Sequence, residues 1–491
     1  MRRSLRRYRP AGGPVAWLVA AGTLYAVAAL VLSRHNPLGW DETVYVSQVD
    51  PRLPPAEFGS PRARGMSVLV APLVVLTGSV TALRGYLALL SAVLLVLAYG
   101  VWLRLRRDGV PRSVPAVALL LLSTLWVTLF YGPSAMPNLW VAVAGVAATG
   151  LLLHHVEVGR GRADLLGVAA ALAAAAVVRP TDAVYLAAPL GLAVLAVRSW
   201  RSRARLGALV GGVALGWLPW VVEAQIRYDG LLPRLRRAAV AQSTSERFDP
   251  VVHLRALDGP ILCRPCPAAT HPLPLDGVLW WAAGVALVVV GVVAAHRRGH
   301  TAYAALPAFA AACFAGVYLV SVAYGAPRFL LPAYALAAIP AAGGLVAVVA
   351  AARPLVWRLL VLVAIAALLA LHVSAQVSTL RDIERVNERS AAQYAVLARA
   401  LNAAGVRPPC LTVGQYAVPA GYPAGCESKK VRDRPGDEPF GVADLQRAVR
   451  TRSVALVQSR RDPVPAWAAG WRRLPLPAEA RPSWAVYVAP R

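Results

Sequence analysis

The stretch that decides the fold is Asn36-Pro37-Leu38-Gly39-Trp40-Asp41-Glu42-Thr43-Val44-Tyr45, which follows a long apolar run at residues 15–32. Its two adjacent carboxylates, Asp41 and Glu42, lie where a chain leaving a bilayer would emerge. Acidic residues are also ordinary in a solvated loop beside a membrane. Whether this pair has a function must therefore be inferred from the rest of the chain.

The composition is that of a polytopic α-helical membrane protein. The 491 residues are 58% hydrophobic with a mean hydropathy of +0.54, and several apolar runs approach the roughly 20 residues that cross a bilayer. The net charge of +27 would suggest a nucleic-acid partner in a soluble protein. Nearly all basic residues are arginines, and many lie in short loops between apolar runs. We interpret them as topology signals and expect no nucleic-acid partner.

The charge pattern predicts about eleven spans, with the N-terminus inside and the C-terminus outside. The apolar stretch at residues 66–80 is interrupted by Pro72 and Gly78, and residues 66–77 are expected to form a helix that lies along the interface. Two short runs meet at Arg179-Pro180-Thr181-Asp182, which predicts a tight turn at or below the outer surface. The expected spans are residues 15–32, 83–103, 114–131, 139–154, 165–178, 183–197, 206–222, 278–295, 302–322, 329–350 and 355–373.

A second domain is expected after the last apolar run. We place a transmembrane catalytic domain at residues 1–375 and a small extracytoplasmic α/β domain at residues 376–491. In the latter, helical patterns at residues 391–404 and 442–451 alternate with strand-like runs at 410–414, 453–458 and 484–489. The polar segment at residues 223–274 is predicted to be a long outer loop.

The cysteines favour structural disulfides. Cys263, Cys266, Cys410 and Cys426 all fall on the side predicted to be outside, where disulfides persist. Their pairing stays open, as does the alternative of free thiols. The Cys-Arg-Pro-Cys motif lacks the second cysteine pair of a zinc ribbon and the context of a thioredoxin motif, so we expect neither a metal nor redox chemistry there.

Several charged residues are predicted to lie near the outer surface of the membrane. An ionised side chain at the hydrocarbon boundary raises the free energy of the protein unless it is paired, hydrated or engaged in binding or catalysis. Each has an ordinary explanation as well as a functional one: loop charge, a local ion pair at a helix turn, a lipid-headgroup contact or a helix cap. The residues are Asp41, Glu42, Arg62, Arg64, Asn138, Arg179, Asp182 and Arg328.

Four short motifs occur in a specific order across the membrane part: Trp40-Asp41-Glu42, Arg64-Gly65-Met66 before the span that starts at Leu83-Arg84, Arg179-Pro180-Thr181, and Pro327-Arg328-Phe329-Leu330-Leu331-Pro332. In this arrangement the chain resembles the GT-C class of integral-membrane glycosyltransferases, which use polyprenyl-phosphate sugars. It is similar to the superfamily of protein mannosyltransferases and aminoarabinose transferases, over residues 16–373.

This resemblance implies roles for the charged residues. Asp41 is expected to be the catalytic base, with Glu42 orienting the acceptor or sharing the role. Arg328 and then Arg179 are the expected ligands of the lipid phosphate. Asp182, Arg64 and Asn138 are further candidates for substrate contact; Asn138 stands where such enzymes often carry an acid. The resemblance implies an inverting transfer with no cofactor, and arginines can neutralise the phosphate without a metal.

The expected partners are a polyprenyl-phosphate sugar donor, a glycan, lipid or protein acceptor, and the bilayer. We expect the cytoplasmic membrane of a bacterium, with the active site on its outer face. A lipid-linked glycan transporter or flippase is one alternative, although the chain shows no paired inverted halves. A non-catalytic envelope assembly protein is another. The sequence leaves the sugar and the acceptor open.

Overall fold

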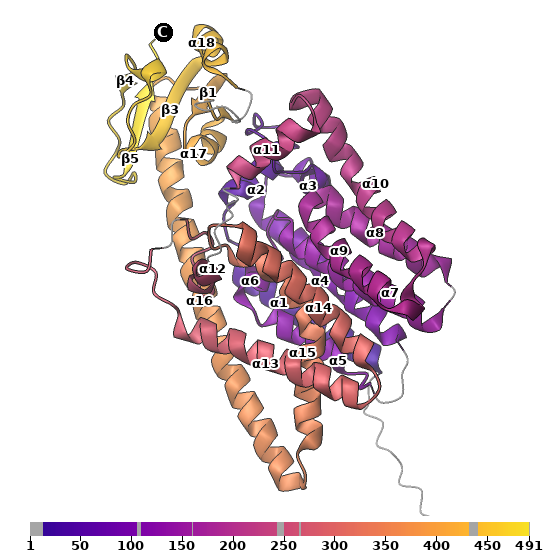
Figure 1. Ribbon diagram of the computed structural model, residues 1–491. Helices are drawn as coiled ribbons and strands as arrows, with labels where there is room; N and C mark the ends of the chain where they lie inside the picture. The colour runs from indigo at the N-terminus through magenta and orange to yellow at the C-terminus, as the bar shows by residue number, and fades with distance from the viewer. Residues whose placement is uncertain are drawn as a thin grey trace, which may run out of the picture.

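The computed structural model describes residues 13–105, 110–159, 161–242, 250–264, 267–431 and 440–490. It consists of a helical bundle and a small sheet domain at the end of one long helix (Figure 1). Within the described ranges, eight helices are long and apolar enough to cross a membrane, and three shorter apolar helices accompany them. The chain is therefore a multi-pass membrane protein with a C-terminal α/β domain, as predicted.

The first part of the chain places the acidic pair in a helix rather than in a loop. Helix α1 (Pro14–Ser33) is followed by the eight-residue α2 (Trp40–Ser47), which contains both acids in its first turn. The stretch predicted to be interfacial forms the ten-residue α3 (Gly65–Val74). Helix α4 (Val80–Gly100) follows and ends in a 3₁₀ turn, η1 (Val101–Arg104).

The span expected at residues 114–131 is broken into two helices, α5 (Val114–Ser123) and α6 (Trp126–Tyr131). At the break Leu125 has an extended backbone, and the Trp126 N–H donates a hydrogen bond to the distant Gln376 Oε1 at 2.8 Å. This bond satisfies a donor that a continuous helix would have paired internally.

The centre of the bundle is built from five further helices and one turn. Helices α8 and α9 meet at Arg179, as predicted, because Arg179 has an extended backbone and Pro180 begins the next helix. The bounds are α7 (Asn138–Val158), α8 (Arg162–Val178), α9 (Pro180–Ala196), η2 (Arg198–Trp200), α10 (Arg203–Arg227) and α11 (Leu231–Ala241).

Three more long helices complete the bundle, and a fourth extends beyond it to the C-terminal domain. After the short α12 (Pro250–Arg255), the chain forms α13 (Leu275–Arg297), α14 (Thr301–Ser321), η3 (Pro327–Leu330) and α15 (Leu331–Ala351). Helix α16 (Leu355–Ala403) then runs for 49 residues without a break. It joins two helices that the sequence pattern had separated, and position 375, the expected domain boundary, lies inside it.

The C-terminal domain is a mixed five-stranded sheet with the strand order β2-β1-β3-β5-β4. Strand β1 runs parallel to β2 and β3, whereas β5 is antiparallel to β3 and β4. Three strands and α18 occur where the sequence predicts them; β2 and β4, with three residues and two residues, were not foreseen. The bounds are β1 (Cys410–Val413), α17 (Ala417–Ala424), β2 (Glu427–Lys429), α18 (Val442–Thr451), β3 (Ser453–Ser459), η4 (Ala466–Ala468), β4 (Arg472–Arg473) and β5 (Trp484–Val488).

Two of the expected cysteines form a disulfide. Cys410 at the start of β1 is bonded to Cys426 just before β2, so the bond ties neighbouring strands together. Cys263 is also disulfide-bonded, and Cys266 lies outside the described residues.

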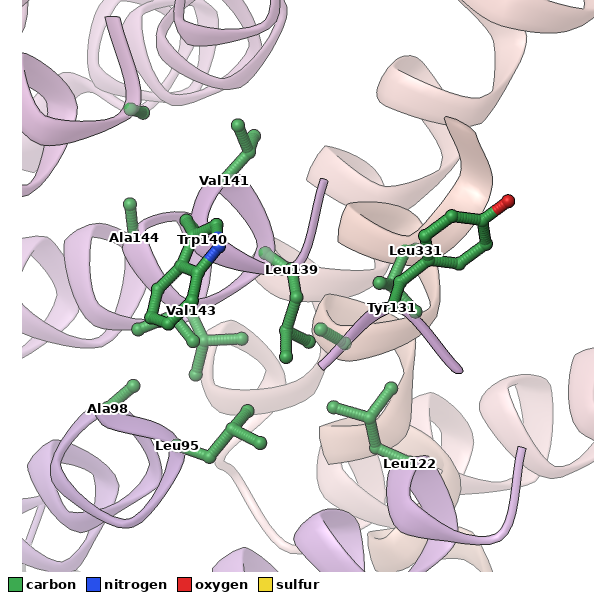
Figure 2. Packing of buried hydrophobic residues seen from close by; sticks show 14 of the residues in the cluster. Leu95, Ala98, Leu122, Tyr131, Leu139, Trp140, Val141, Val143, Ala144 and Leu331 are labelled. Carbon is green, nitrogen blue, oxygen red and sulfur yellow. The ribbon is translucent and has the colours of Figure 1, made fainter. Parts of the chain in front are cut away.

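Helix α7 is the most deeply buried of the candidate spans. Its side chains pack against several neighbouring helices, which makes α7 the axis of the bundle. Figure 2 shows Leu139, Trp140, Val141, Val143 and Ala144 of α7 together with Leu95 and Ala98 of α4, Leu122 of α5 and Leu331 of α15.

The C-terminal domain rests on the helix that carries the acidic pair. Trp40 of α2 contacts Tyr416, with ring centroids 6.3 Å apart, and the Tyr422 hydroxyl of α17 donates a hydrogen bond to Asp50 at 2.8 Å. Ala56 also forms a parallel β-bridge with Ser428 of β2. The domain therefore covers the end of the bundle at which α2 lies (Figure 1).

Glycine sets the close contact between α13 and α15, which provides a test of the bundle. A Cβ atom at Gly291 would lie 1.8 Å from the Pro340 carbonyl oxygen, whereas a Cβ at Gly284 of the same helix meets nothing within 4 Å. We expect Gly291→Val to destabilise the protein by roughly 1–3 kcal/mol through overpacking. Gly284→Val should have little effect. Thermal unfolding in detergent measures the difference, and equal melting temperatures of the two variants would contradict this packing.

Candidate active site

Glu42 is held by a buried network at the start of α2. Its Oε2 accepts hydrogen bonds from the Gly39 N–H at 2.9 Å and from Arg84 Nη2 at 2.8 Å. Its Oε1 accepts from the Ala135 N–H at 2.7 Å and also contacts Arg84 Nη1. The side chains of Arg84 and Glu42 are 1% and 5% exposed. Both oxygens of Glu42 are thus engaged within the protein.

Arg84 in turn fixes the loops around Glu42. Its guanidinium donates to three backbone carbonyl oxygens at 2.8–3.0 Å, those of Asn36, Pro37 and Pro133. The pair therefore ties α4 to the loop before α2 and to the loop before α7. The direction of the neighbouring residue, Asp41, follows from this anchorage.

Asp41 lies between two arginines. Arg62 Nη2 is 2.5 Å from Asp41 Oδ1, and Arg328 Nη2 is 3.3 Å from Oδ2. The Asp41 side chain remains 33% exposed, so a ligand can reach it. Burial raises the pKa of Asp41, but the charges of Arg62 and Arg328 outweigh burial and hold that pKa below its usual value. The carboxylate is ionised at neutral pH and is therefore ready to accept a proton.

A third arginine completes the positive environment. Arg179 Nε lies 2.9 Å from Asp182 Oδ2, and the Tyr318 hydroxyl donates to Asp182 Oδ1 at 2.5 Å while it accepts from Arg179 at 3.1 Å. The guanidinium carbons of Arg179 and Arg328 each lie 5.1 Å from the centre of the Phe329 ring. The ring thus holds two like charges near one another through cation–π contacts.

The site has an excess of positive charge. In the described part of the chain, the guanidiniums of Arg62, Arg179 and Arg328 form ion pairs with two carboxylates, Asp41 and Asp182, of which Asp182 is fully buried. Such a group suits an anion that arrives with at least one negative charge. Among the described residues no three His, Cys, Asp or Glu side chains are grouped so as to hold a metal ion.

Arg64 belongs to a different cluster. It lies 2.7 Å from Glu223, which also binds Arg234 at 2.9 Å. It donates to Gln48 Oε1 at 2.7 Å and stacks over Phe58, with 3.8 Å to the ring centre. The structure does not bring Arg64 together with Asp41, although Arg62, two residues earlier, does reach it.

Asn138 begins α7 and is fully buried. Neither its amide nitrogen nor its amide oxygen has a hydrogen-bond partner in the described part of the chain. Asn138 lies three residues after Ala135, whose backbone N–H donates a hydrogen bond to Glu42. A buried, unpaired amide is costly, so Asn138 is suited to bind a polar group that the protein itself does not supply.

Sequence reasoning missed three residues of the site. The sequence pattern marked Arg84 only as part of the start of a span, although an arginine in the second turn of an apolar helix indicates a buried partner. Tyr45 interacts electrostatically with Asp41 and with all three arginines of the site, and its place one helical turn after Asp41 was the available signal. Tyr318 comes from an apolar run and had no signal in the local sequence.

The fold matches solved structures. ArnT from Cupriavidus metallidurans in the apo state has a TM-score of 0.60 at 14% identity, over 96% of this chain and 97% of that chain. ArnT bound to undecaprenyl phosphate has a TM-score of 0.58 at 14% identity, over 96% and 98%. The archaeal oligosaccharyltransferase AglB from Archaeoglobus fulgidus, in complex with an inhibitory peptide and a dolichol-phosphate, has 0.53 at 13% identity, over 90% and 69%.

These neighbours confirm the GT-C fold that the sequence predicts. No family profile and no curated protein matches the sequence.

The buried Glu42–Arg84 pair generates a stability prediction. Arg84→Met leaves the Glu42 carboxylate buried without its cation and should cost roughly 3–5 kcal/mol. The exposed pair of Arg385 and Asp382, with side chains 62% and 59% exposed, supplies the control; Arg385→Met should leave stability nearly unchanged. The melting temperatures of the two variants, measured by thermal unfolding, test this difference in stability. Two equal, small effects would show that α2 does not depend on this pair.

Proposed function

We propose that this chain, a membrane protein with the GT-C fold, is an inverting glycosyltransferase that moves a sugar from a polyprenyl-phosphate donor to an extracytoplasmic acceptor. The observation that carries the proposal is the partly exposed Asp41 carboxylate between Arg62 and Arg328. The undecaprenyl phosphate bound to ArnT and the dolichol-phosphate bound to AglB support a lipid-phosphate donor. The acceptor is a hydroxyl or other nucleophile of a glycan, lipid or protein.

The reaction needs one base and one place for negative charge. The acceptor oxygen attacks the anomeric carbon from the face opposite the phosphate, so a new carbon–oxygen bond forms while the bond to the phosphate oxygen breaks. The acceptor proton passes to the Asp41 carboxylate. The configuration at the anomeric carbon is inverted because the displacement is direct.

The arginines act on the leaving group. The phosphate is a singly charged diester in the donor and gains negative charge as it becomes a monoester. Arg328 and Arg179, which lie on the same Phe329 ring, are assigned to its oxygens. Fixed guanidiniums that meet a charge as it develops stabilise the transition state more than the ground state.

Donor binding also activates the base. In the free protein the arginines hold the pKa of Asp41 low, which makes the carboxylate a weak base. When the phosphate takes over Arg328, this stabilisation of the Asp41 charge decreases and the carboxylate becomes more basic. The donor itself thus prepares Asp41 for the acceptor.

The other residues have supporting roles in this proposal. Glu42 positions α2 through Arg84, Asp182 and Tyr318 hold Arg179, and Asn138 offers its unpaired amide to a substrate hydroxyl. Arg64 orients the outer loops through Glu223 rather than binding the phosphate.

The decisive experiment compares sugar transfer by the wild type with that by Asp41→Asn in membranes supplied with a panel of polyprenyl-phosphate sugars. Loss of the base should lower the rate on the order of 10²–10⁴-fold. Asp229→Asn, an exposed acid with an 80% exposed side chain, is the matched control and should keep full activity.

Transfer that is equal in the wild type and Asp41→Asn would remove Asp41 as the base. Movement of intact lipid-linked sugar across vesicles by both proteins, without transfer, would favour the flippase. Melting temperatures of the variants show whether a lost rate reflects lost folding.

The pH dependence provides a second prediction. Because Arg62 and Arg328 lower the pKa of Asp41, kcat/KM should fall only at a pH below the ordinary range of an aspartate. Arg328→Gln removes one of these charges, so the pKa of Asp41 rises and the acid limb of kcat/KM moves to higher pH. Arg460→Gln, an exposed arginine of the C-terminal domain, should leave the limb in place. An unchanged limb in Arg328→Gln would contradict the coupling.

A further inference from the structure

A buried tyrosine lies near the candidate base. Tyr131 is the last residue of α6, which packs against the η3 turn that carries Arg328. Its side chain is almost fully buried and interacts electrostatically with Arg328 and with Asp41. Tyr131 therefore belongs to the same site as the candidate base and one of the arginines assigned to the phosphate.

The packing around Tyr131 fixes where its hydroxyl lies. The Phe130 ring meets the Tyr131 ring edge-on, with the ring centroids 4.8 Å apart. The next residue, Gly132, is held against α1, because a Cβ atom there would clash with the Tyr25 hydroxyl. Figure 2 shows the Tyr131 hydroxyl directed away from the labelled apolar side chains of α7. A side chain held in this way loses little conformational entropy when it binds a ligand.

Two buried polar atoms at this place do not complete a hydrogen bond. Among the described residues, neither the Tyr131 hydroxyl nor Arg328 Nε has a partner with hydrogen-bond geometry, although the two side chains lie close enough to interact. A buried polar group without a partner raises the free energy of the folded protein. The two groups are therefore suited to a ligand that supplies the missing acceptors.

The charge of Arg328 determines how the tyrosine can act. A guanidinium has only N–H donors, so the lone pairs of the Tyr131 oxygen face Arg328 and the hydroxyl hydrogen points away from it. Both side chains thus offer donors to a ligand that the arginine attracts. A phosphodiester fits this pair, since its two unesterified oxygens share a negative charge and have no hydrogen of their own. A sugar hydroxyl is uncharged and fits less well.

We propose that Tyr131 is a catalytic residue of the transfer, whose hydroxyl donates a hydrogen bond to the departing lipid phosphate beside Arg328. This inference rests on the proposed sugar transfer and adds a neutral donor to the arginines that meet the leaving group. The O–H bond of Tyr131 stays intact while the bond between the anomeric carbon and the phosphate oxygen breaks. The hydrogen bond strengthens as the phosphate changes from a singly charged diester to a monoester with more negative charge.

Binding of undecaprenyl phosphate to the purified full chain tests the inference without knowledge of the sugar or the acceptor. Tyr131→Phe removes only the hydroxyl and should weaken this binding roughly ten- to hundredfold, as expected for one hydrogen bond to a charged group. Undecaprenol, which has the same chain but no phosphate, should bind equally to the wild type and to Tyr131→Phe. In transfer assays kcat should fall by more than KM for the donor rises, because the bond is strongest to the leaving group.

Tyr99→Phe is the matched control. The Tyr99 side chain is also buried, but its hydroxyl donates to the Ala335 carbonyl oxygen at 2.8 Å. Its loss should lower the melting temperature and leave the binding of undecaprenyl phosphate unchanged. Tyr131→Phe should show the opposite pattern, because the hydroxyl that it removes completes no hydrogen bond with the described residues. A lower melting temperature with unchanged binding in Tyr131→Phe would indicate a structural role and overturn the inference.

Arg328→Gln separates this inference from the proposed function. If Arg328→Gln weakens the binding of undecaprenyl phosphate and Tyr131→Phe does not, the inference on Tyr131 is wrong while the sugar transfer stands. Unchanged binding in both variants would remove the phosphate site itself, and the inference with it. A higher KM for the acceptor in Tyr131→Phe, with unchanged binding of undecaprenyl phosphate, would place the hydroxyl on the acceptor and would also overturn the inference.

Discussion

The buried ion pair of Glu42 and Arg84 is the interaction on which the candidate site depends. A lone charge at this depth would be strongly unfavourable, and each partner is therefore fully surrounded by hydrogen bonds of the other and of the backbone. Arg84 sits in the first helical turns of a spanning helix, whereas Glu42 is 42 positions earlier in a short helix outside the spans. The ion pair fixes α2 against the bundle. The adjacent Asp41 is then directed toward Arg62 and Arg328.

Five of the arginines near α2 fall into two groups according to their burial. Arg84 and Arg234 are fully buried. Their charges are neutralised by carboxylates and carbonyl oxygens of the protein, so these two arginines stabilise the fold. Arg62, Arg179 and Arg328 remain partly accessible, and within the described residues these three arginines pair with two carboxylates, Asp41 and Asp182. This second group surrounds the partly exposed Asp41 carboxylate, which is why we place the candidate site beside Asp41.

The C-terminal domain contributes to the same region by position. Helix α16 carries it out of the bundle as one continuous element (Figure 1), and two hydrogen bonds from α16 reach back to the α1–α2 region: Ser33 donates to Glu384, and Asn387 to Asn36. Together with the contact of Trp40 and Tyr416, these bonds hold the domain over α2. In the proposed reaction, an acceptor on its way to Asp41 would pass beside the sheet domain.

Local patterns in the sequence were sufficient for the membrane class, most helices, three of the five strands and the break at Arg179, because hydropathy, periodicity and proline act over a few neighbouring residues. They also singled out Asp41, Arg179 and Arg328, since charges beside apolar runs are conspicuous. The break between α5 and α6 was not foreseen; the side chain that pairs with the Trp126 N–H at this break is Gln376, 250 positions away.

Only the tertiary structure decided which of the two adjacent acids is buried and which of the two nearby arginines, Arg62 or Arg64, reaches the site. Glu42 is neutralised by Arg84, and Asp41 meets an arginine 287 positions away. The residues next to a carboxylate in the sequence do not indicate which cation it will meet. Its role depends on which opposite charges the folded chain brings within a few ångströms and on how much water remains around it.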